Sequence, residues 1–290
     1  MNATAPGPAR LYDAHNHLQD ERLQPYWDEV ARGLEREPVA AMVVNGACQQ
    51  DWPVVLALAR NDSRVIPSFG YHPWYINERT AGWQEELARF LDAVPSGVGE
   101  IGLDKWVRGH DLGQQTEVFA WQMQLAAERN LPASIHCLQA WGTLLDVLRA
   151  GPRPQCGFVL HSFGGPREMI PELAALGAYF SLPGYFAHER KARQREAFLA
   201  VPPERLLIET DAPDQSLPPE RVRYPLPAQP DGKPLNHPAN LGAVYAFAAE
   251  LFNEPIEALA ARVEQNFLRV FGRLKSTCGT VRHTINHLPR

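Results

Sequence analysis

"LYDAHNHLQ", residues 11–19, places two histidines on alternate positions at the end of a short apolar run. In a β-strand, residues i and i+2 project from the same face, so His15 and His17 would lie close enough to bind one ion. An isolated H-x-H pair is more often incidental than a metal site. The stretch therefore predicts a strand that ends in two candidate ligands, and the residues on the other strands decide between these interpretations.

The length and composition are those of an ordinary globular protein. The chain has 290 residues, enough for two average domains or for one α/β barrel of about 250 residues. The net charge of −5 argues against a basic surface that coats nucleic acid without specificity. It leaves open an enzyme that meets phosphate groups through bound metal cations.

The cysteines and the chain ends indicate a reduced setting. The scattered cysteines, with no C-x-x-C pair, predict neither a disulfide framework nor a zinc ribbon: Cys48, Cys137, Cys156 and Cys278. Residues 1–10 lack the features of a secretory signal, and no apolar run approaches the ~20 residues of a membrane span. We expect a cytoplasmic protein with no membrane contact and no obligate protein partner. We also expect a disordered segment at 1–9 and a polar tail at 275–290.

Short apolar runs alternate with longer amphipathic stretches along the chain. The predicted strands span residues 10–17, 39–47, 64–72, 97–104, 132–137, 156–163, 178–185 and 205–211. The predicted helices span residues 50–60, 79–93, 113–130, 140–149, 166–176 and 188–200. Several strands are near-continuous apolar runs, as expected for a parallel sheet covered by helices. The clearest helix is the last, with apolar residues at spacings of three and four from Ile256 to Leu274 and Pro255 suited to its first turn.

Eight β-then-α units in one chain of this length predict an α/β fold, a TIM-type (β/α)8 barrel formed by residues 10–274 as a single domain. The same alternation could build a doubly wound open sheet. No G-x-G-x-x-G follows the first strand, so a dinucleotide-binding sheet loses its main support. Residues 213–238 interrupt the pattern with eight prolines. They are either a loop on the substrate side or irregular chain without a role.

Four further residues of ligand type lie in or at the ends of predicted strands: Glu100, His136, His161 and Asp211. Burying a carboxylate or an imidazole there costs several kcal/mol unless something pairs with it. In a barrel, the carboxyl ends of the strands meet at one mouth, where active sites lie. For any one of these residues, a hydrogen-bonded core position is the better interpretation. Together with His15 and His17, all at equivalent positions, they predict a metal site at the carboxyl-terminal mouth.

The six side chains suit divalent metal ions. Imidazoles favour Zn, Mn or Fe, whereas carboxylates also accept Mg. One open catalytic zinc site needs fewer ligands, so we expect two ions about 3.5–4 Å apart, bridged by a carboxylate. Mg, Mn and Zn are the candidate ions. Glu100 is the predicted bridge because it lies in the middle of the set, between the histidines.

The motifs around these residues occur in the order seen in a known family. They are "DAHNH", "GYHP", "GEIGLD", "SIHC", "LHSFGG" and "ETDAP", followed near the end by "NHPANL" and "NFLRVFG". Over residues 10–274 the chain resembles the TatD family of metal-dependent deoxyribonucleases, within the amidohydrolase-like barrels. The resemblance implies a distorted TIM barrel and hydrolysis of phosphodiester bonds.

The resemblance also implies roles for individual residues. The family's metal positions match His15, His17, Glu100, His136, His161 and Asp211. His72, in "GYHP", matches a histidine on the substrate side. Three departures leave the ligand set intact and concern the substrate. Lys105 and Trp106 follow "GLD", the cysteine usually found after the histidine at 161 is missing, and Ala212 replaces a hydroxyl residue.

The resulting hypothesis is a metal-dependent 3′-5′ exonuclease that acts on single-stranded DNA ends. Asp211 is the predicted general base for the attacking water, and Glu100 is the second catalytic residue. His72 or Lys105 would hold a non-bridging phosphoryl oxygen. For Lys105, a plain surface position is an equally good interpretation.

Two groups of residues near the predicted mouth have alternative interpretations. Tyr71, Trp74 and Trp106 could stack on the bases of single-stranded DNA, although packing within loops is the commoner role for any one aromatic residue. The basic stretch "HERKARQR", residues 188–195, is interpreted as the solvated face of a helix rather than as a phosphate track.

Two other functions remain open. An amidohydrolase-type enzyme for a small ester, amide or lactone would use the same barrel, but such enzymes often carry a carboxylated lysine as the bridge, and Glu100 favours the nuclease. A binding or scaffold protein would be expected to have lost ligands, and all six are present. The sequence leaves open the native metal, exonuclease against endonuclease action, DNA against RNA, and the oligomeric state.

Overall fold

The computed structural model of the chain describes residues 9–109 and 111–275. Apart from Ala9 and Lys275, the expected N-terminal segment 1–9 and tail 275–290 lie outside the described residues. The strands are β1 (Leu11–Asn16), β2 (Val39–Gly46), β3 (Val65–Phe69), β4 (Gly97–Asp104), β5 (Ala133–Leu138), β6 (Phe158–Leu160), β7 (Ala178–Pro183) and β8 (Leu206–Glu209).

Parallel pairing joins the strands in chain order, from β1 to β8. Past the end of β8, the N–H of Asp211 donates to the carbonyl of His15 at 3.0 Å, and the N–H of His17 donates to the carbonyl of Ala212 at 2.7 Å. These bonds bring the last strand beside the first, so the sheet curves into a barrel. The predicted TIM-type (β/α)8 barrel is confirmed, with its seam formed by the segments that follow β8.

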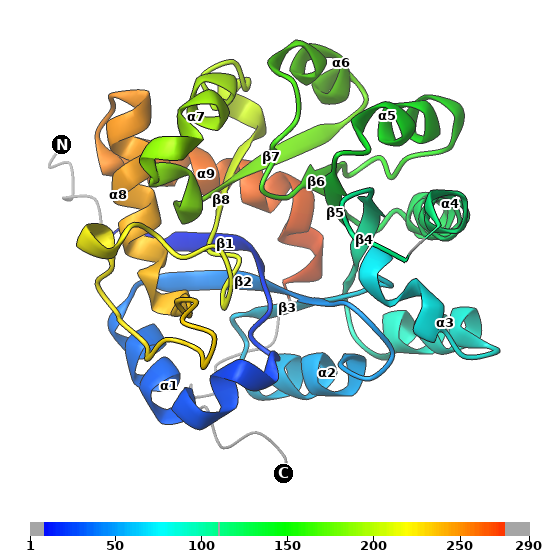
Figure 1. Cartoon of the computed structure of the whole chain (residues 1–290), viewed down its shortest axis with the longest axis horizontal. Coiled ribbons are helices and arrows are strands. Elements are labelled where there is room, and N and C mark those ends of the chain that lie inside the picture. The colour runs from blue at the N-terminus through cyan, green and yellow to red at the C-terminus, as the bar shows by residue number, and fades with distance from the viewer. Residues whose placement is uncertain (1–8, 110, 276–290) are drawn as a thin grey trace, which may run out of the picture.

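The helices form a ring outside the strands, in chain order (Figure 1). They are α1 (Trp27–Arg36), α2 (Trp52–Asn61), α3 (Trp83–Ala93), α4 (Leu112–Arg129), α5 (Trp141–Ala150), α6 (Ile170–Ala175), α7 (Ala192–Phe198) and α8 (Leu241–Phe252), with α9 (Ile256–Phe271) after them. Short 3-10 helices are Glu21–Tyr26, Pro73–Glu78, Arg167–Met169, Gly184–Ala187, Glu189–Lys191, Pro203–Arg205, Pro219–Arg221, Pro238–Asn240 and Gly272–Leu274. The sequence prediction had not named α1 or α8.

Several predicted strands were too long at their carboxyl ends. The stretches predicted at 64–72, 156–163 and 205–211 end as strands at Phe69, Leu160 and Glu209. Beyond β6 and β8 the backbone leaves the extended conformation, since Ser162 has φ 45° and Asp211 has φ 52°. The apolar run predicts where a strand passes through the core, but side chains at the mouth sit on the turns that follow.

The barrel interior is apolar at the amino ends of the strands. Inward residues of six strands pack there against one side of α9, in a cluster that we call the plug cluster: Tyr12, Ala14, Ala41, Val43, Ile66, Val159, Tyr179, Leu207, Phe267, Val270 and Phe271. In Figure 1, α9 crosses behind the strands. The last predicted helix is thus confirmed, and its apolar stripe closes one end of the barrel.

The proline-rich segment 213–238 is held against the barrel by the "NHPANL" motif. The side-chain amide of Asn236 donates to the carbonyl of Thr210 at 2.8 Å, next to Asp211. The side-chain oxygen of Asn240 accepts from the N–H groups of Arg223 and Tyr224 at 3.0 and 2.9 Å. This motif therefore fixes the loop beside the mouth. In the part of the chain that the structure describes, no helix has the length and hydropathy needed to cross a membrane.

Candidate metal centre

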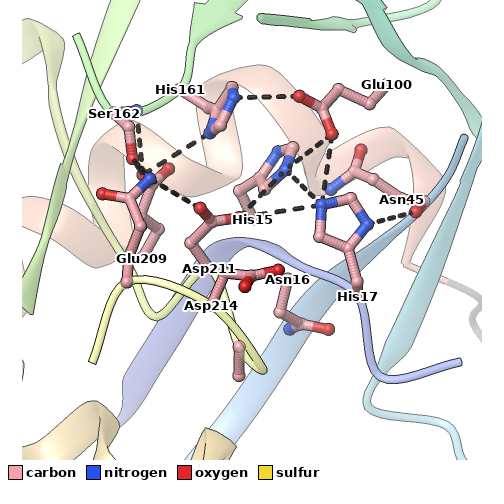
Figure 2. Close-up of polar contacts among 12 residues, drawn as sticks. His15, Asn16, His17, Asn45, Glu100, His161, Ser162, Glu209, Asp211 and Asp214 are labelled. Carbon is pink, nitrogen blue, oxygen red and sulfur yellow. Dashed lines mark hydrogen bonds and ion pairs between the residues drawn. The ribbon is translucent and has the colours of Figure 1, made fainter. Parts of the chain in front are cut away.

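Strand alternation turns the barrel interior from apolar to polar toward the carboxyl ends. Two residues beyond the plug cluster, the inward positions become Asn45 after Val43, His161 after Val159 and Glu209 after Leu207. All six predicted ligands meet at this polar end. Figure 2 shows His15, His17, Glu100, His161 and Asp211 pointing toward one another.

One oxygen of the Glu100 carboxylate faces the histidines of β1 and its following turn. Glu100 Oε2 lies 3.4 Å from His15 Nε2 and 3.1 Å from His17 Nε2, and these two nitrogens are 3.2 Å apart. Asp211 Oδ1 completes the group at 3.6 Å from His15 Nε2 and 3.7 Å from His17 Nε2. We call these four donors the first donor set.

The other oxygen of Glu100 faces a different pair of histidines. Glu100 Oε1 lies 2.9 Å from His161 Nε2 and 3.3 Å from His136 Nδ1, and the two nitrogens are 3.2 Å apart. We call these three donors the second donor set. Glu100, which is 3% exposed, thus stands between the two sets, with one oxygen in each.

The separations within both sets fit divalent metal ions. An ion bound tetrahedrally through bonds of about 2.1 Å has ligand atoms about 3.4 Å apart. The distances of 2.9–3.7 Å given above scatter around that value. The donor chemistry therefore fits divalent metal ions, with Glu100 between the two donor sets.

Hydrogen bonds on the far sides of two rings determine which nitrogen faces the centre. His17 Nδ1 lies 2.8 Å from the carbonyl oxygen of Asn45, which can only accept, so Nδ1 carries the proton. His136 Nε2 lies 3.1 Å from Asp104 Oδ2, which selects the opposite tautomer for that ring. In both neutral rings, the nitrogen with the free lone pair points at Glu100, as a metal ligand requires.

The other two rings have polar neighbours that do not fix the tautomer. His15 Nδ1 lies 2.7 Å from the hydroxyl of Ser134, which can donate or accept. His161 Nδ1 lies 3.8 Å from Glu209 Oε1, too far for a hydrogen bond. Their rings are stacked, with centroids 4.1 Å apart, so that both Nε2 atoms project toward Glu100.

His72 differs from the other histidines in its tautomer. Its Nε2 lies 3.4 Å from Glu100 Oε1, which is close enough for a metal group with His136. However, its Nδ1 accepts from the backbone N–H of Trp74 at 3.1 Å, so in the neutral ring Nε2 carries the proton. Burial lowers the pKa of His72 to about 4, which keeps the ring neutral. His72 is therefore built as a hydrogen-bond donor beside the centre.

The histidines around Glu100 stabilise its negatively charged form. Burial disfavours the charged Glu100 carboxylate, but the positive charges that His72, His161 and His15 carry when protonated outweigh burial and hold its pKa well below the usual range. Burial also lowers the pKa of His17, but the Glu100 hydrogen bond and the charges of Glu100 and Asp211 raise it to about 9. His17 is thus protonated at neutral pH in the metal-free protein.

Asp211 has a proton affinity suited to acid–base chemistry. Burial raises the pKa of its carboxyl to about 7, against the lowering effect of the His161 and His17 charges. Its Oδ2 accepts a hydrogen bond from the side-chain amide of Gln215 at 2.6 Å, which leaves Oδ1 facing the first donor set.

Three buried acids of the site were missed in the sequence: Asp13, Asp104 and Glu209. Asp13 accepts from the N–H and hydroxyl of Thr210 at 3.0 and 2.6 Å, across the seam of the barrel. Glu209 accepts from the hydroxyls of Ser162 and Ser181. The sequence could have indicated them, because each is an acid within an apolar run. Asp13 and Glu209 lie two residues before the predicted ligands His15 and Asp211, and Asp104 ends the motif that contains Glu100.

The residues predicted to contact the substrate besides His72 differ in their exposure. Lys105 is exposed after β4, and its backbone N–H donates to the carbonyl of Leu138 at 2.9 Å. Trp74 and Trp106 are exposed, but Tyr71 is buried against Trp52 and Trp83, so the idea that Tyr71 stacks on bases was wrong.

The basic stretch 188–195 is partly used for hydrogen bonds within its own segment. Arg195 donates to the carbonyls of Phe186 and His188 at 2.7 and 2.6 Å. Arg190 and Arg193 are exposed, in agreement with a solvated face.

The chain matches one protein family along nearly all its length. The model of the family described as TatD related DNase matches residues 12–272. The 3′-5′ ssDNA/RNA exonuclease TatD of Shigella flexneri is 31% identical over 268 residues, which are 90% of this chain and 99% of that protein. The uncharacterized metal-dependent hydrolase YcfH of Escherichia coli K12 is 31% identical over 267 residues, covering 90% of this chain and 95% of that protein.

A solved structure has the same architecture. The crystal structure of YjjV, a TatD homologue from Escherichia coli K12, superimposes with a TM-score of 0.81 at 26% identity, covering 91% of this chain and 98% of that one. The solved structure thus shares the barrel fold of this chain.

Proposed function

We propose that this chain, which belongs to the TatD-related DNase family of metal-dependent hydrolases, is a 3′-5′ exonuclease that cleaves phosphodiester bonds at single-stranded DNA ends. The relatives named as exonucleases support the reaction class, and relatives named only as hydrolases leave the substrate to be tested. The observation that carries the proposal is the position of Glu100. Its two carboxylate oxygens face two different pairs of histidines, an arrangement suited to a pair of metal ions that act on one phosphoryl group.

The proposed ligands are the six predicted residues. The first donor set, with His15, His17, Glu100 and Asp211, would hold one ion, and the second, with Glu100, His136 and His161, would hold the other. Mg, Mn and Zn are the candidate ions. When bound, the ions supply positive charge to the phosphoryl oxygens and acidity to the attacking water.

In the proposed mechanism, Asp211 is the general base. Its Oδ1 faces the first donor set, so the carboxylate is placed to take a proton from a water held there. Gln215 holds Asp211 Oδ2, so the proton would be taken on the oxygen that faces the centre. Glu100 would keep the two donor sets at a constant separation.

The substrate would be held by residues that do not bind metal. The Nε2 proton of His72 would donate to a non-bridging phosphoryl oxygen, because the backbone N–H of Trp74 leaves the ring no other neutral tautomer. The exposed ammonium of Lys105 would contact a phosphate farther along the strand. Both contacts are electrostatic and independent of the base sequence.

We extend the proposal to the organisation and location of the enzyme. Residues 10–274 would form one domain, and the enzyme would act in the cytoplasm. The free thiols among the described residues, Cys48, Cys137 and Cys156, agree with a reducing compartment. Independence from an obligate protein partner stays a prediction.

The test uses metal-stripped protein and single-stranded DNA labelled at its 3′ or 5′ end. Mg, Mn and Zn are added back separately, and His15→Ala runs beside the wild type. We expect metal-dependent shortening from the 3′ end that His15→Ala loses. Intact DNA together with turnover of a small ester, amide or lactone would overturn the nuclease assignment and leave the metal centre in place.

A further inference from the structure

Exposed apolar side chains gather at one side of the mouth. The described part of the chain has five exposed large hydrophobic side chains: Trp74, Trp106, Leu138, Leu199 and Leu268. The first three follow or end neighbouring strands, namely β3, β4 and β5. Trp74 is 43% exposed, Trp106 63% and Leu138 39%. We call these three residues the mouth patch.

Asp104 at the end of β4 joins the three residues of the mouth patch. Its Oδ2 accepts from the indole N–H of Trp74 at 2.6 Å, and its Oδ1 accepts from the backbone N–H of Trp106 at 2.7 Å. Leu138 is paired in register with Asp104 across the β4–β5 ladder. The buried carboxylate therefore fixes the Trp74 ring and the backbone of Trp106, beside the strand position of Leu138.

The mouth patch borders the candidate metal centre directly. The Trp74 ring meets the His72 ring edge to face at 5.1 Å between centroids, and it lies 6.2 Å from the His136 ring. Asp104 Oδ2, which holds the indole, also accepts from His136 Nε2 at 3.1 Å. A group attached to a phosphate at the second donor set would therefore lie against this patch.

Charges next to the patch suit a polyanion. Lys105 and Arg108 are exposed on the same turn as Trp106. The adjoining loop is fixed to that turn, because the side-chain amide of Asn77 donates to the carbonyl of Gly109 at 3.3 Å. Flat apolar rings beside isolated cations form a combination that binds bases and phosphates of a single strand together.

We propose that the mouth patch is a stacking subsite for the nucleobase at the strand end, an inference that rests on the proposed nuclease function. Trp74 forms the inner wall, with its ring orientation held by Asp104. Trp106 and Leu138 form the outer surface. The subsite orients the terminal nucleotide without selecting its base, since every base offers an aromatic face.

The first test measures binding apart from hydrolysis. The full-length protein is kept in EDTA, so that no strand is cut, and is titrated into single-stranded DNA that carries 2-aminopurine at the 3′ end. This probe reports stacking by quenching, and it avoids the ambiguity of a chain with seven tryptophans. We expect Trp106→Ala to weaken binding about 5-fold to about 100-fold and Trp106→Phe to restore most of it.

The control variant is Leu199→Ala. Leu199 is 55% exposed, but it follows α7 and precedes β8, so it lies at the opposite end of the barrel. Binding by this variant should equal that of the wild type. If Trp106→Ala binds as tightly as the wild type, or if the probe is not quenched, the subsite assignment is overturned.

The second test compares hydrolysis of normal and 3′-abasic strands by the metal-loaded enzyme. The wild type should prefer the normal end through KM, and Trp106→Ala should lose that preference while kcat stays within a few fold. Equal preference in both enzymes would overturn the subsite but leave the nuclease assignment intact. Quenching with no hydrolysis of any strand would overturn the nuclease assignment and support the subsite.

Discussion

The two ends of the barrel interior are built on the same strands but have opposite chemistry. At the amino ends, residues such as Tyr12 and Val159 pack on Phe267 and Phe271 of α9, with no charged side chain in the plug cluster. Two residues farther along the strands, histidines and acids surround Glu100. The amino ends of the strands thus form a packed hydrophobic base, and the carboxyl ends form the polar surface that this base supports.

The comparison shows how a barrel separates stability from function. Burial of apolar area at the plug stabilises the fold, whereas buried like and unlike charges at the mouth cost free energy until cations arrive. Changes at the plug should therefore alter unfolding and spare the chemistry of the folded molecules. Changes at the mouth should do the reverse.

The largest effect is expected from Phe267→Ala. Phe267 is fully buried, with its ring 4.8 Å from Tyr12 and 4.9 Å from Phe271, so its loss leaves a cavity. We expect the free energy of unfolding to fall by about 3–5 kcal/mol, as measured by urea denaturation. The neighbour Leu268→Ala, at a position 38% exposed, is the control and should change little. A drop in metal bound per folded molecule would break the separation between the two ends.

Next in size is the effect of Glu100→Gln on turnover. The amide keeps the shape of the side chain but removes the charge shared between the two donor sets. We expect kcat to fall about 10²- to 10³-fold, with metal content reduced. Glu117→Gln, on the exposed face of α4, is the matched control. Retention of two ions per chain would rule out Glu100 as the bridge.

A smaller effect is expected from Asp104→Asn. Asp104 orients His136 through its Nε2 and also holds Trp74, and the hydrogen bonds from both keep its pKa near 2 despite burial. We expect metal affinity to fall about 10- to 100-fold, as measured by calorimetric titration. An unchanged affinity would show that the tautomer of His136 does not depend on this carboxylate.

The smallest effect concerns pH. The pKa of His17 is raised to about 9, so at pH 7 a metal must displace its proton. Metal affinity should rise by up to about tenfold per pH unit between 7 and 9. A flat affinity over this range would mean that His17 is already neutral in the metal-free protein.

Stability without metal should move in the opposite direction. The raised pKa of His17 contributes stability below its ordinary pKa of about 6.5, which is lost as the pH rises through about 9. Asp211, with its pKa raised to about 7, adds a loss between about pH 4 and 7. Thermal melts in EDTA should therefore shift to lower temperature from pH 7 to 9, where His17 is the titrating group.

The sequence predicted most of the fold because the periods of its apolar residues are local. All eight strands were found, and β4 was predicted with its observed bounds, Gly97–Asp104. The errors lie at the mouth, where strands predicted through His72, His161 and Asp211 end earlier, because polar turns begin before the apolar composition changes. Tyr71 was misjudged for a related reason, since exposure depends on Trp52 and Trp83 from other elements.

The sequence alone determined the family, the barrel and the six candidate ligands, since residue type and spacing along single strands carry that information. Only the tertiary structure decided which of these residues belong to the same donor set and which neighbour has another role. It places the two oxygens of Glu100 in different donor sets, and it distinguishes His72 as a hydrogen-bond donor through a contact with Trp74. The physical reason is that a tautomer, a raised pKa or a bridging position depends on partners brought from other strands, and no local period encodes them.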